Sequence, residues 1–452
     1  MGRFGGGGLR RIAVVLSFAL GAGFLAACSS SPAHPSSTGT SRTHTTQRGP
    51  TPSTQPSTAT TLPAQPVLTG GAISVPVPAG PSVAPPATIA SDCSVDVSAA
   101  LKSWFKALAP DTTVVMRSGA CYEVNEGIRL KNPQGLTVYG GQYRSTAVPS
   151  DQKGKAASAK GHAAFAVVGG SHVTLESMQI SGANTGGFHP RLAFAAGIDF
   201  QGTANAVVRG VTITDTFGDG ITLAPLRGGA NHNSGMIIAP ASNVTIDGVT
   251  IDGAGRQGLT LASISGAQVS DIILRNVGLD TFDVEADQTG EGATDVTIDG
   301  CVASGGDVFF ANGGSGNASG THDITVEHCT MTMPQAGSAI LVVRHGRGGK
   351  KGRLRGPFVF TSDVLRCGTS AYVGCVQLQG GNVTVADSHL VFPSGSAEGA
   401  VYGLSGATAA FSRDVVTGYG RRGNVSGASF VHIAGGVWTP AGQGANAART
   451  NP

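Results

Sequence analysis

Short apolar segments that alternate with polar positions recur along most of the chain. The pattern V-x-I-x-x-V-x-I, with variations, begins at positions such as Val173, Val244, Val296, Ile324 and Val383. A second short segment follows each copy, and glycine, aspartate and asparagine occupy the corners between them. Because strand side chains point alternately to opposite faces, each segment predicts a short strand with one buried face. The recurrence predicts a stack of repeats.

The spacing of the copies narrows the choice of repeat architecture. Neighbouring copies lie about 24 to 38 residues apart, within the range of known repeat proteins. A propeller blade needs four strands and about 40–45 residues, more than the shortest repeats contain. The hexapeptide rhythm of a left-handed β-helix is absent. We therefore expect an all-β fold, a right-handed parallel β-helix of about ten coils.

One segment before the repeats has helical periodicity instead. Its apolar residues recur at the spacing of one helix face, and Pro110 ends the segment. A terminal repeat needs a polar outer face, so this amphipathic helix is expected to cap the stack. The apolar positions are Val97, Leu101, Trp104, Phe105 and Leu108.

The N-terminal region has the features of an export signal. Arg10 and Arg11 precede an apolar run over 12–20, which is too short for a membrane-spanning helix of roughly 20 residues. The following segment, 25–29, reads Leu-Ala-Ala-Cys-Ser and resembles a bacterial lipoprotein box. That resemblance implies lipid attachment at Cys28 and anchoring to the outer face of the cell membrane. An ordinary cleaved signal peptide with an incidental cysteine is the alternative, and it also exports the protein.

Composition suggests four regions. Residues 1–27 are expected to form the signal peptide, and 28–88, rich in Ser, Thr and Pro, a disordered tether. The β-helix domain is expected over 89–440, and 441–452 is expected to be a disordered tail.

Several of these features together resemble the pectin-lyase-like β-helix superfamily. They are the cap helix, the Gly-Ala-Cys-Tyr step over 119–122 and the two-strand repeats. More narrowly, Arg-Gln-Gly at 256–258 followed by Asp-Val-Glu at 283–285 resembles bacterial β-helix proteins with an R-Q-G … D-[IV]-E signature. The N-T-D, D-D, G-H-G and R-I-K motifs of polygalacturonases and the W-I-D-H motif of pectate lyases are absent. The resemblance therefore implies the fold and carries over no catalytic residue.

The strongest chemical candidate is the acidic strand around residue 284. Asp283, Glu285 and Asp287 share one face, and the first two have Cα atoms roughly 6.6 Å apart. Aligning the repeats places Asp307 beside Asp283 on the next coil, at about 4.8 Å. Crowded carboxylates raise the pKa of one member and so supply an acid beside a base. Arg256, one coil earlier, is placed to hold a substrate carboxylate or stabilise negative charge.

This alignment yields a set of candidate site residues on one outer face. The catalytic candidates are Asp283, Glu285, Asp307, Asp219 and Arg256. Outward hydrogen-bonding side chains and rings along a groove are typical of sugar-binding surfaces. The substrate-binding candidates are Gln257, Asp199, Thr222, Thr260, Phe309, Gln377 and Tyr402.

Three interpretations of the acidic face are open at this point. The first is a glycoside hydrolase or polysaccharide lyase; the second is a non-catalytic glycan-binding or surface-scaffold protein using the same face. The third is a solvated surface, and the carboxylates are also compatible with Ca²⁺. No other cofactor is expected.

The net charge and its distribution along the chain narrow the class of expected binding partner. The net charge is +3, and no basic helix with interleaved aromatic residues occurs, so nucleic-acid binding is not expected. Positive charge is concentrated over 344–355, which would suit an anionic polysaccharide if that loop covers the face. A loop with Asn-His-Asn at 231–233 is expected to border the same groove. We expect a monomer.

Six cysteines follow Cys28, an even number that invites pairing outside the cytoplasm. The expected neighbours are Cys93 with Cys121 and Cys367 with Cys375. Cys301 and Cys329 hold the same place in consecutive repeats, so they stack at about one strand spacing, within disulfide range. Free buried thiols are the alternative for this last pair.

Overall fold

The computed structural model describes most of the region expected to form the repeats. The described residues are 73–146, 163–188, 192–228, 236–286, 288, 290–313, 320–332, 339–342, 356–367, 374–378, 381–392, 399–403, 407–419 and 430–440. The expected signal peptide, Cys28, the tether up to 72 and the tail lie outside them. So do Asp287 and the loops 231–233 and 344–355.

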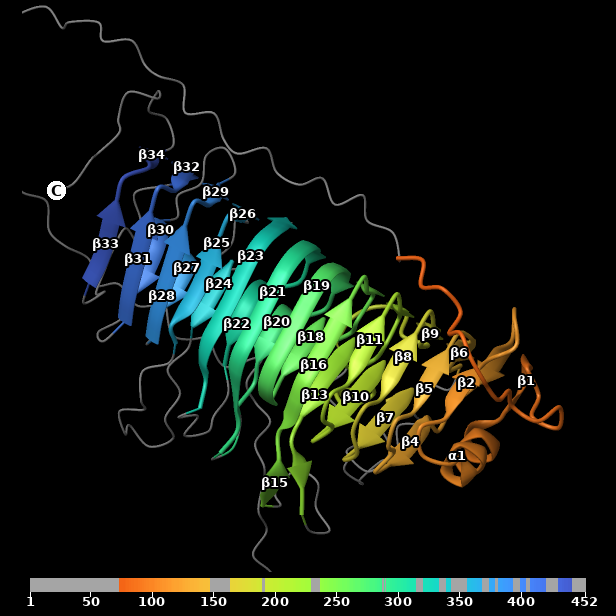
Figure 1. Cartoon of the computed structure of the whole chain (residues 1–452). Coiled ribbons are helices and arrows are strands. Elements are labelled where there is room, and N and C mark those ends of the chain that lie inside the picture. Colours follow the sequence, from red (N-terminus) through yellow and green to blue (C-terminus); the bar gives the residue numbers. More distant parts are fainter. Residues whose placement is uncertain are drawn as a thin grey trace, which may run out of the picture. The chain divides into compact units, whose positions relative to one another are not determined.

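The chain winds as a parallel β-helix in which each coil adds one strand to each face (Figure 1). One face is a ten-stranded parallel sheet, which agrees with the expected number of coils. The strands lie side by side in the order in which they occur along the chain. They are β4 (Ile128–Lys131), β7 (Phe165–Val168), β10 (Ile198–Gln201), β13 (Ile221–Ala224), β18 (Leu259–Leu261), β20 (Asp280–Val284), β22 (Val308–Asn312), β24 (Ile340–Val342), β27 (Gly374–Leu378) and β30 (Gly399–Gly403).

The remaining faces form a continuous 22-stranded sheet, because three long strands, β19, β21 and β23, run through the corner between them. Its strands are β1 (Asp92–Asp96), β2 (Thr113–Val115), β3 (Cys121–Glu123), β5 (Thr137–Tyr139), β6 (Gln142–Arg144), β8 (Thr174–Glu176), β9 (Gln179–Ser181), β11 (Val207–Arg209), β12 (Thr212–Thr214), β16 (Ala241–Asp247), β17 (Thr250–Asp252), β19 (Ser263–Val277), β21 (Gly292–Gly305), β23 (His322–Thr332), β25 (Phe358–Thr361), β26 (Val364–Arg366), β28 (Gly381–Ala386), β29 (His389–Val391), β31 (Ala407–Ser412), β32 (Val415–Tyr419), β33 (Phe430–Ala434) and β34 (Val437–Pro440). A small antiparallel hairpin, β14 (Leu226–Arg227) with β15 (Ile237–Ala239), projects after β13.

Inward side chains stack in register to form one continuous core. On the ten-stranded sheet, Ile198, Ile221, Leu259, Phe282 and Phe310 follow one another on successive coils and are all fully buried. Burying such a side chain contributes roughly 1.5–3 kcal/mol, so the repeating apolar position is the main source of stability.

The expected cap helix is present as α1 (Ser98–Ala107). Leu101 and Phe105 are buried, and Trp104 and Leu108 pack at the edge of the core. The Phe105 ring contacts the Phe165 ring edge-on at 6.4 Å. The helix therefore covers the apolar end of the first coils. No helix among the described residues is long and apolar enough to cross a membrane.

The end of the expected tether needs correction. Residues 73–88 lie along the coils instead of being free: Tyr139 donates a hydrogen bond to the Val75 carbonyl at 2.8 Å. Arg117 does the same to the Pro85 carbonyl at 2.6 Å. Gly248 permits the contact, because a Cβ there would lie 2.3 Å from the Ile73 side chain. Apolar side chains among the prolines let this segment bind the β-helix surface.

All three expected disulfides are present. The Cα–Cα distances are 5.1 Å for Cys93–Cys121, 4.4 Å for Cys301–Cys329 and 5.7 Å for Cys367–Cys375. Cys301 and Cys329 are directly paired residues of β21 and β23, as their equivalent places in the repeat predicted.

Candidate functional site

The expected column of outward residues exists on the ten-stranded sheet. Directly paired residues on successive strands are Asp199, Thr222, Thr260, Asp283, Ala311, Leu341, Gln377 and Tyr402. Neighbouring members are therefore about one strand spacing, 4.8 Å, apart. The apolar pair at Ala311 and Leu341 separates the acidic part of the column from Gln377 and Tyr402. The polar site is thus confined to β10, β13, β18 and β20.

The expected position of Asp307 beside Asp283 is wrong. Asp283 pairs with Ala311, and Asp307 precedes β22, where its N–H donates to the Leu279 carbonyl. A turn at Gly305 and Gly306, both at positive φ, shifts the register by four residues from the one assumed. Asp307 is exposed and lies at the edge of the site, near Asp280.

The expected exposure of Phe309 is also wrong. Its side chain is fully buried, and its ring contacts Phe282 edge-on at 5.4 Å. Burying a phenyl ring is favourable by roughly 1.5–3 kcal/mol, which favours its place in the core over the outer face. Phe309 therefore stabilises the strand that bears Asp283 and offers no surface to a sugar.

Arg256 joins two carboxylates. Its Nη1 lies 3.3 Å from Oδ2 of Asp219, and its Nη2 donates to both carboxylate oxygens of Glu285. The Arg256 side chain is 13% exposed, and that of Glu285 is 25% exposed. Both Nη groups of the guanidinium thus have protein carboxylates as partners, and the expected role of Arg256 toward a substrate stays a prediction.

Asp219 is the fixed centre of this arrangement. Its Oδ2 accepts hydrogen bonds from the hydroxyls of Thr222 at 3.0 Å and Thr260 at 2.7 Å. Its Oδ1 accepts from the Gln257 main-chain N–H at 3.3 Å. With Arg256 added, the carboxylate is saturated and buried. Asp219 is therefore placed to position its neighbours, with no lone pair facing a ligand.

A second chain of contacts reaches Asp283. The Thr260 hydroxyl also lies 2.6 Å from Oε1 of Gln257, whose amide donates to Oδ2 of Asp283. Gln257 and Thr260 were expected to bind substrate, but they are only 3% and 1% exposed. They instead hold the carboxyl group of Asp283 from within the protein. The other carboxyl oxygen, Oδ1, faces Gly313, where a Cβ would lie 4.0 Å away.

Burial raises the pKa values of several of these acids. Desolvation raises the pKa of Asp283 well above its usual range, and the charges of Glu285 and Asp280 raise it further. Burial also raises the pKa of Asp280 to about 7 and that of Asp199 to about 6. Arg256 opposes the shift at Asp283 and Asp280 without cancelling it. A protonated Asp283 thus lies two residues from an ion-paired Glu285.

Asp280 at the site, and Phe194 in a segment beside it, are not among the residues expected from the sequence. Asp280 occupies the corner position that Asp219 and Gln257 occupy on earlier coils, and that equivalence was the available signal. Phe194 is 48% exposed in the segment before β10, between Ala193 and Ala195. The Ala195 carbonyl accepts the N–H of Gly218, next to Asp219. Phe194 lies in an irregular segment without the repeat pattern, so the sequence does not predict where it lies relative to the site.

One rim of the site is a buried ion pair between two loops. Arg227 of the β14–β15 hairpin pairs with Glu291, which follows β20, and donates to Gln288 at 2.7 Å. Both charged side chains are less than a tenth exposed. The hairpin is therefore tied to the segment that follows the acidic strand.

The remaining candidates lie at one end of the site or beyond it. Asp199 accepts from Gln201, and Gln377 is largely buried three strands beyond Asp283. Tyr402 lies on β30, where its backbone pairs with that of Gln377 as expected. Within the described part of the chain, no group of three or more His, Cys, Asp or Glu side chains is arranged to hold a metal ion. Arg256 binds the carboxylate oxygens of Glu285 and lies close to those of Asp219, and Ca²⁺ would compete with it for these oxygens.

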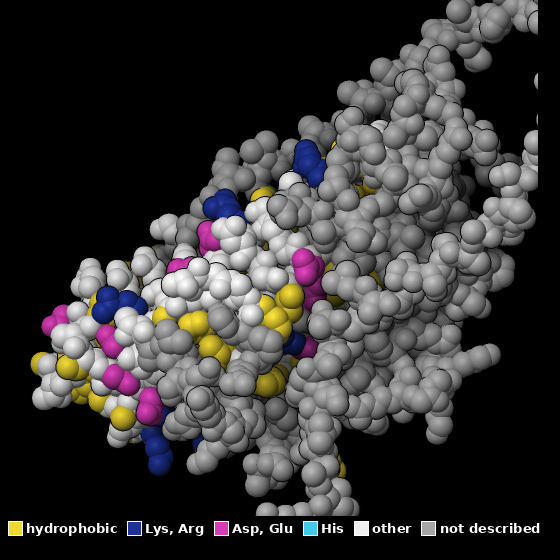
Figure 2. All heavy atoms as spheres, turned by 180° about the vertical axis from the view of Figure 1, so that it is seen from behind, with side chains coloured by type: hydrophobic (Ala, Val, Ile, Leu, Met, Phe, Trp, Pro, Cys, Tyr) yellow, Lys and Arg dark blue, Asp and Glu magenta, His cyan; other side chains and the backbone are white. Residues whose placement is uncertain are grey.

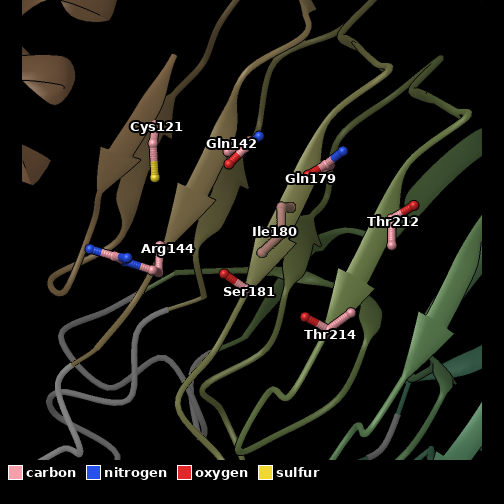
Figure 3. A pocket seen from close by; sticks show the side chains of 8 residues that line it. All are labelled: Cys121, Gln142, Arg144, Gln179, Ile180, Ser181, Thr212 and Thr214. Carbon is pink, nitrogen blue, oxygen red and sulfur yellow. The ribbon is translucent and has the colours of Figure 1, made fainter. Parts of the chain in front are cut away.

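The faces outside the ten-stranded sheet do not share this cluster of carboxyl groups among their described residues. An open depression of about 170 Å³ lies on β3, β6, β9 and β12, lined by side chains such as Gln142, Gln179 and Thr212 (Figure 3). It contains one charged side chain, Arg144, and no carboxylate. The face shown in Figure 2 has acidic and basic side chains interspersed, without a continuous basic area among its described residues.

The sequence matches no protein-family model, and no curated protein matches it either. Solved structures do match. The tailspike protein of E. coli bacteriophage HK620, in complex with a pentasaccharide, aligns with TM-score 0.51 and 12% identity over 78% of this chain. This chain spans 62% of the tailspike. A DFA-IIIase from Arthrobacter chlorophenolicus A6, solved without its lid, aligns with TM-score 0.50 and 11% identity, covering 79% of this chain and 92% of its own.

This chain is a right-handed parallel β-helix protein. At such identities the similarity shows the fold, and the chemistry has to be argued from the site itself.

Proposed function

We propose that this protein is a glycan-active enzyme that hydrolyses glycosidic bonds on the outer face of β18 and β20. Asp283 would be the general acid and Glu285 the base or nucleophile. Asp219 and Arg256 would hold Glu285 in place. The observation that carries the proposal is the pairing of a proton-retaining carboxyl with an ion-paired carboxylate two residues away.

The proposed reaction uses only these groups and water. Asp283 donates its proton to the glycosidic oxygen while the bond from that oxygen to the anomeric carbon breaks. Glu285 either takes a proton from the attacking water or attacks the carbon itself, and water then releases the sugar. The two Cα atoms are roughly 6.6 Å apart along the strand, and the side-chain separation decides between the two routes. The configuration of the released sugar reports which route operates.

Hydrolysis is better supported than β-elimination. A lyase acts on a uronate, and an unpaired arginine is one group that can neutralise its carboxylate. Arg256 is already neutralised by Asp219 and Glu285. The alternative function, non-catalytic glycan binding on the same face, is favoured by the pentasaccharide complex of the structurally similar tailspike.

Turnover by site variants tests the proposal. A panel of polysaccharides is incubated with the protein, and new reducing ends are measured. Asp283→Asn and Glu285→Gln should each lower kcat by at least 10²-fold while ligand is retained. Asp387→Asn, which removes an exposed partner of Arg413, is the matched control and should keep full activity. Retention without cleavage by every form would support the binding protein, and neither retention nor cleavage would contradict both functions.

We also propose that the protein is exported and anchored through a lipid on Cys28. The support is the Leu-Ala-Ala-Cys-Ser sequence at 25–29 and the three disulfides, which form in oxidising compartments. The intact mass of the mature N-terminus measures lipidation directly. Cys28→Ser should move the protein from the membrane fraction to the soluble fraction, and an unmodified Cys28 would contradict the anchor.

A further inference from the structure

We propose that the site takes an uncharged glycan and excludes chains that bear carboxylate or phosphate groups. The inference rests on the proposed function and names the substrate class of the same site. It reverses the expectation of an anionic polymer, which the sequence had suggested through the basic segment 344–355.

The first support is the bonding of the central cation. An arginine that recognises a uronate presents its planar fork to the ligand. Both Nη groups of the Arg256 guanidinium instead face protein carboxylates, Nη1 toward Asp219 and Nη2 toward Glu285. The side chain is also mostly buried. A substrate anion would have to displace one of these carboxylates and leave it buried without a counter-charge, which is strongly unfavourable.

The second support is the sign of the surrounding charge. Six carboxyl groups lie in or beside the site and act on one another electrostatically: Asp199, Asp219, Asp280, Asp283, Glu285 and Asp307. Among the described residues, Arg129 also acts on them; it lies near Asp199 and donates to Gln201 at 3.2 Å. A cleft lined by one sign of charge repels a ligand of that sign. Even with Asp283 protonated and Asp280 partly protonated, the remaining carboxylates outnumber these two arginines, so an anionic substituent near the scissile bond would be repelled.

The third support is the exposed aromatic ring of Phe194. It is half-exposed in a segment whose backbone contacts Gly218, directly before Asp219. An aromatic ring binds the apolar face of an uncharged sugar by stacking and gains nothing from a carboxylate. The segment that contacts Gly218 therefore offers an exposed apolar ring beside the hydrogen-bonding acids, an arrangement that would suit neutral sugars.

The experiment measures retention on an array that holds neutral, uronate-bearing and phosphorylated oligosaccharides of matched backbones. We expect retention of neutral members and at least a tenfold loss when a uronate replaces the corresponding neutral sugar. Retention should change less than twofold between 20 and 500 mM NaCl, because no ligand charge is involved. Phe194→Ala should raise KM about tenfold with kcat little changed, and Phe194→Trp should restore KM.

A specificity change gives the sharpest readout. Glu285→Gln frees one edge of Arg256, so uronate retention should rise at least fivefold over wild type while hydrolysis is lost. Retention of anionic chains equal to or stronger than neutral chains by the wild type would overturn this inference and leave the hydrolase proposal standing. Retention of no glycan at all would overturn both.

Discussion

Two groups of buried carboxyls in this β-helix differ in what surrounds them. The first is the outer group, Asp219, Asp283 and Glu285, joined by Arg256. The second is an inner column in the C-terminal coils, where Asp363, Ser388 and Asp414 follow Cys329 at equivalent turns. Asp363 accepts the Cys329 N–H at 2.8 Å, and Asp414 accepts the Ser388 N–H at 2.9 Å. Asp363 and Asp414 are fully buried.

In the inner column, the buried carboxyl groups are stabilised mainly by hydrogen bonds from backbone N–H groups. Oδ2 of both Asp363 and Asp414 has no hydrogen-bond partner among the described residues. Burial raises the pKa of Asp363 well above its usual range and raises that of Asp414 to about 7. A raised pKa alone therefore does not mark a catalytic group here. The outer group differs because a second, ion-paired carboxylate and an outward orientation accompany the raised pKa.

The largest expected effect comes from removing the cation of the outer group. Arg256→Met leaves Asp219 and Glu285 without a counter-charge, and we expect the free energy of unfolding to fall by about 3 kcal/mol. Urea unfolding followed by circular dichroism measures the change. Arg413→Met, which breaks the exposed pair with Asp387, is the control and should have little effect. Equal effects of the two substitutions would show that the outer group is ordinary surface charge.

The pH dependence of stability tests the inner column. The pKa of Asp414 is higher in the folded state than in the unfolded state, so folding favours its proton. Its contribution is complete below about pH 4 and is lost as pH rises to about 7, at about 1.4 kcal/mol per unit of pKa difference. Asp414→Asn should remove this part of the slope. Asp387→Asn, on the surface of the same coils, controls for general charge, and an unchanged slope in Asp414→Asn would contradict the prediction.

The smallest expected effect concerns Asp280, which acts on Asp283 through its charge. Its negative charge helps to raise the pKa of Asp283, so Asp280→Asn should let Asp283 lose its proton at lower pH. We expect the alkaline limb of the kcat profile to move to lower pH by less than one unit, with the maximal kcat retained. A purely structural Asp280 would instead lower activity equally at every pH.

Much of the fold was predictable because the repeat imposes the same burial pattern on every coil. The apolar alternation, the cap helix and the three disulfides all follow from sequence spacing, and each is found. The errors fall where the spacing is irregular. The turn at Gly305 and Gly306 shifts β22 by four residues, so the expected position of Asp307 beside Asp283 is wrong. Residues 73–88 were misassigned because proline-rich composition does not reveal a binding surface.

The sequence by itself determined the parallel β-helix and the outward column that holds Asp199, Thr222, Thr260 and Asp283, since strand periodicity dictates which side chains share a face. Only the tertiary structure decided how that column works. The partners of Arg256 and the support of Asp283 by Gln257 depend on contacts between coils about 25 to 40 residues apart. Such contacts follow from coil register and side-chain direction, which local periodicity does not contain.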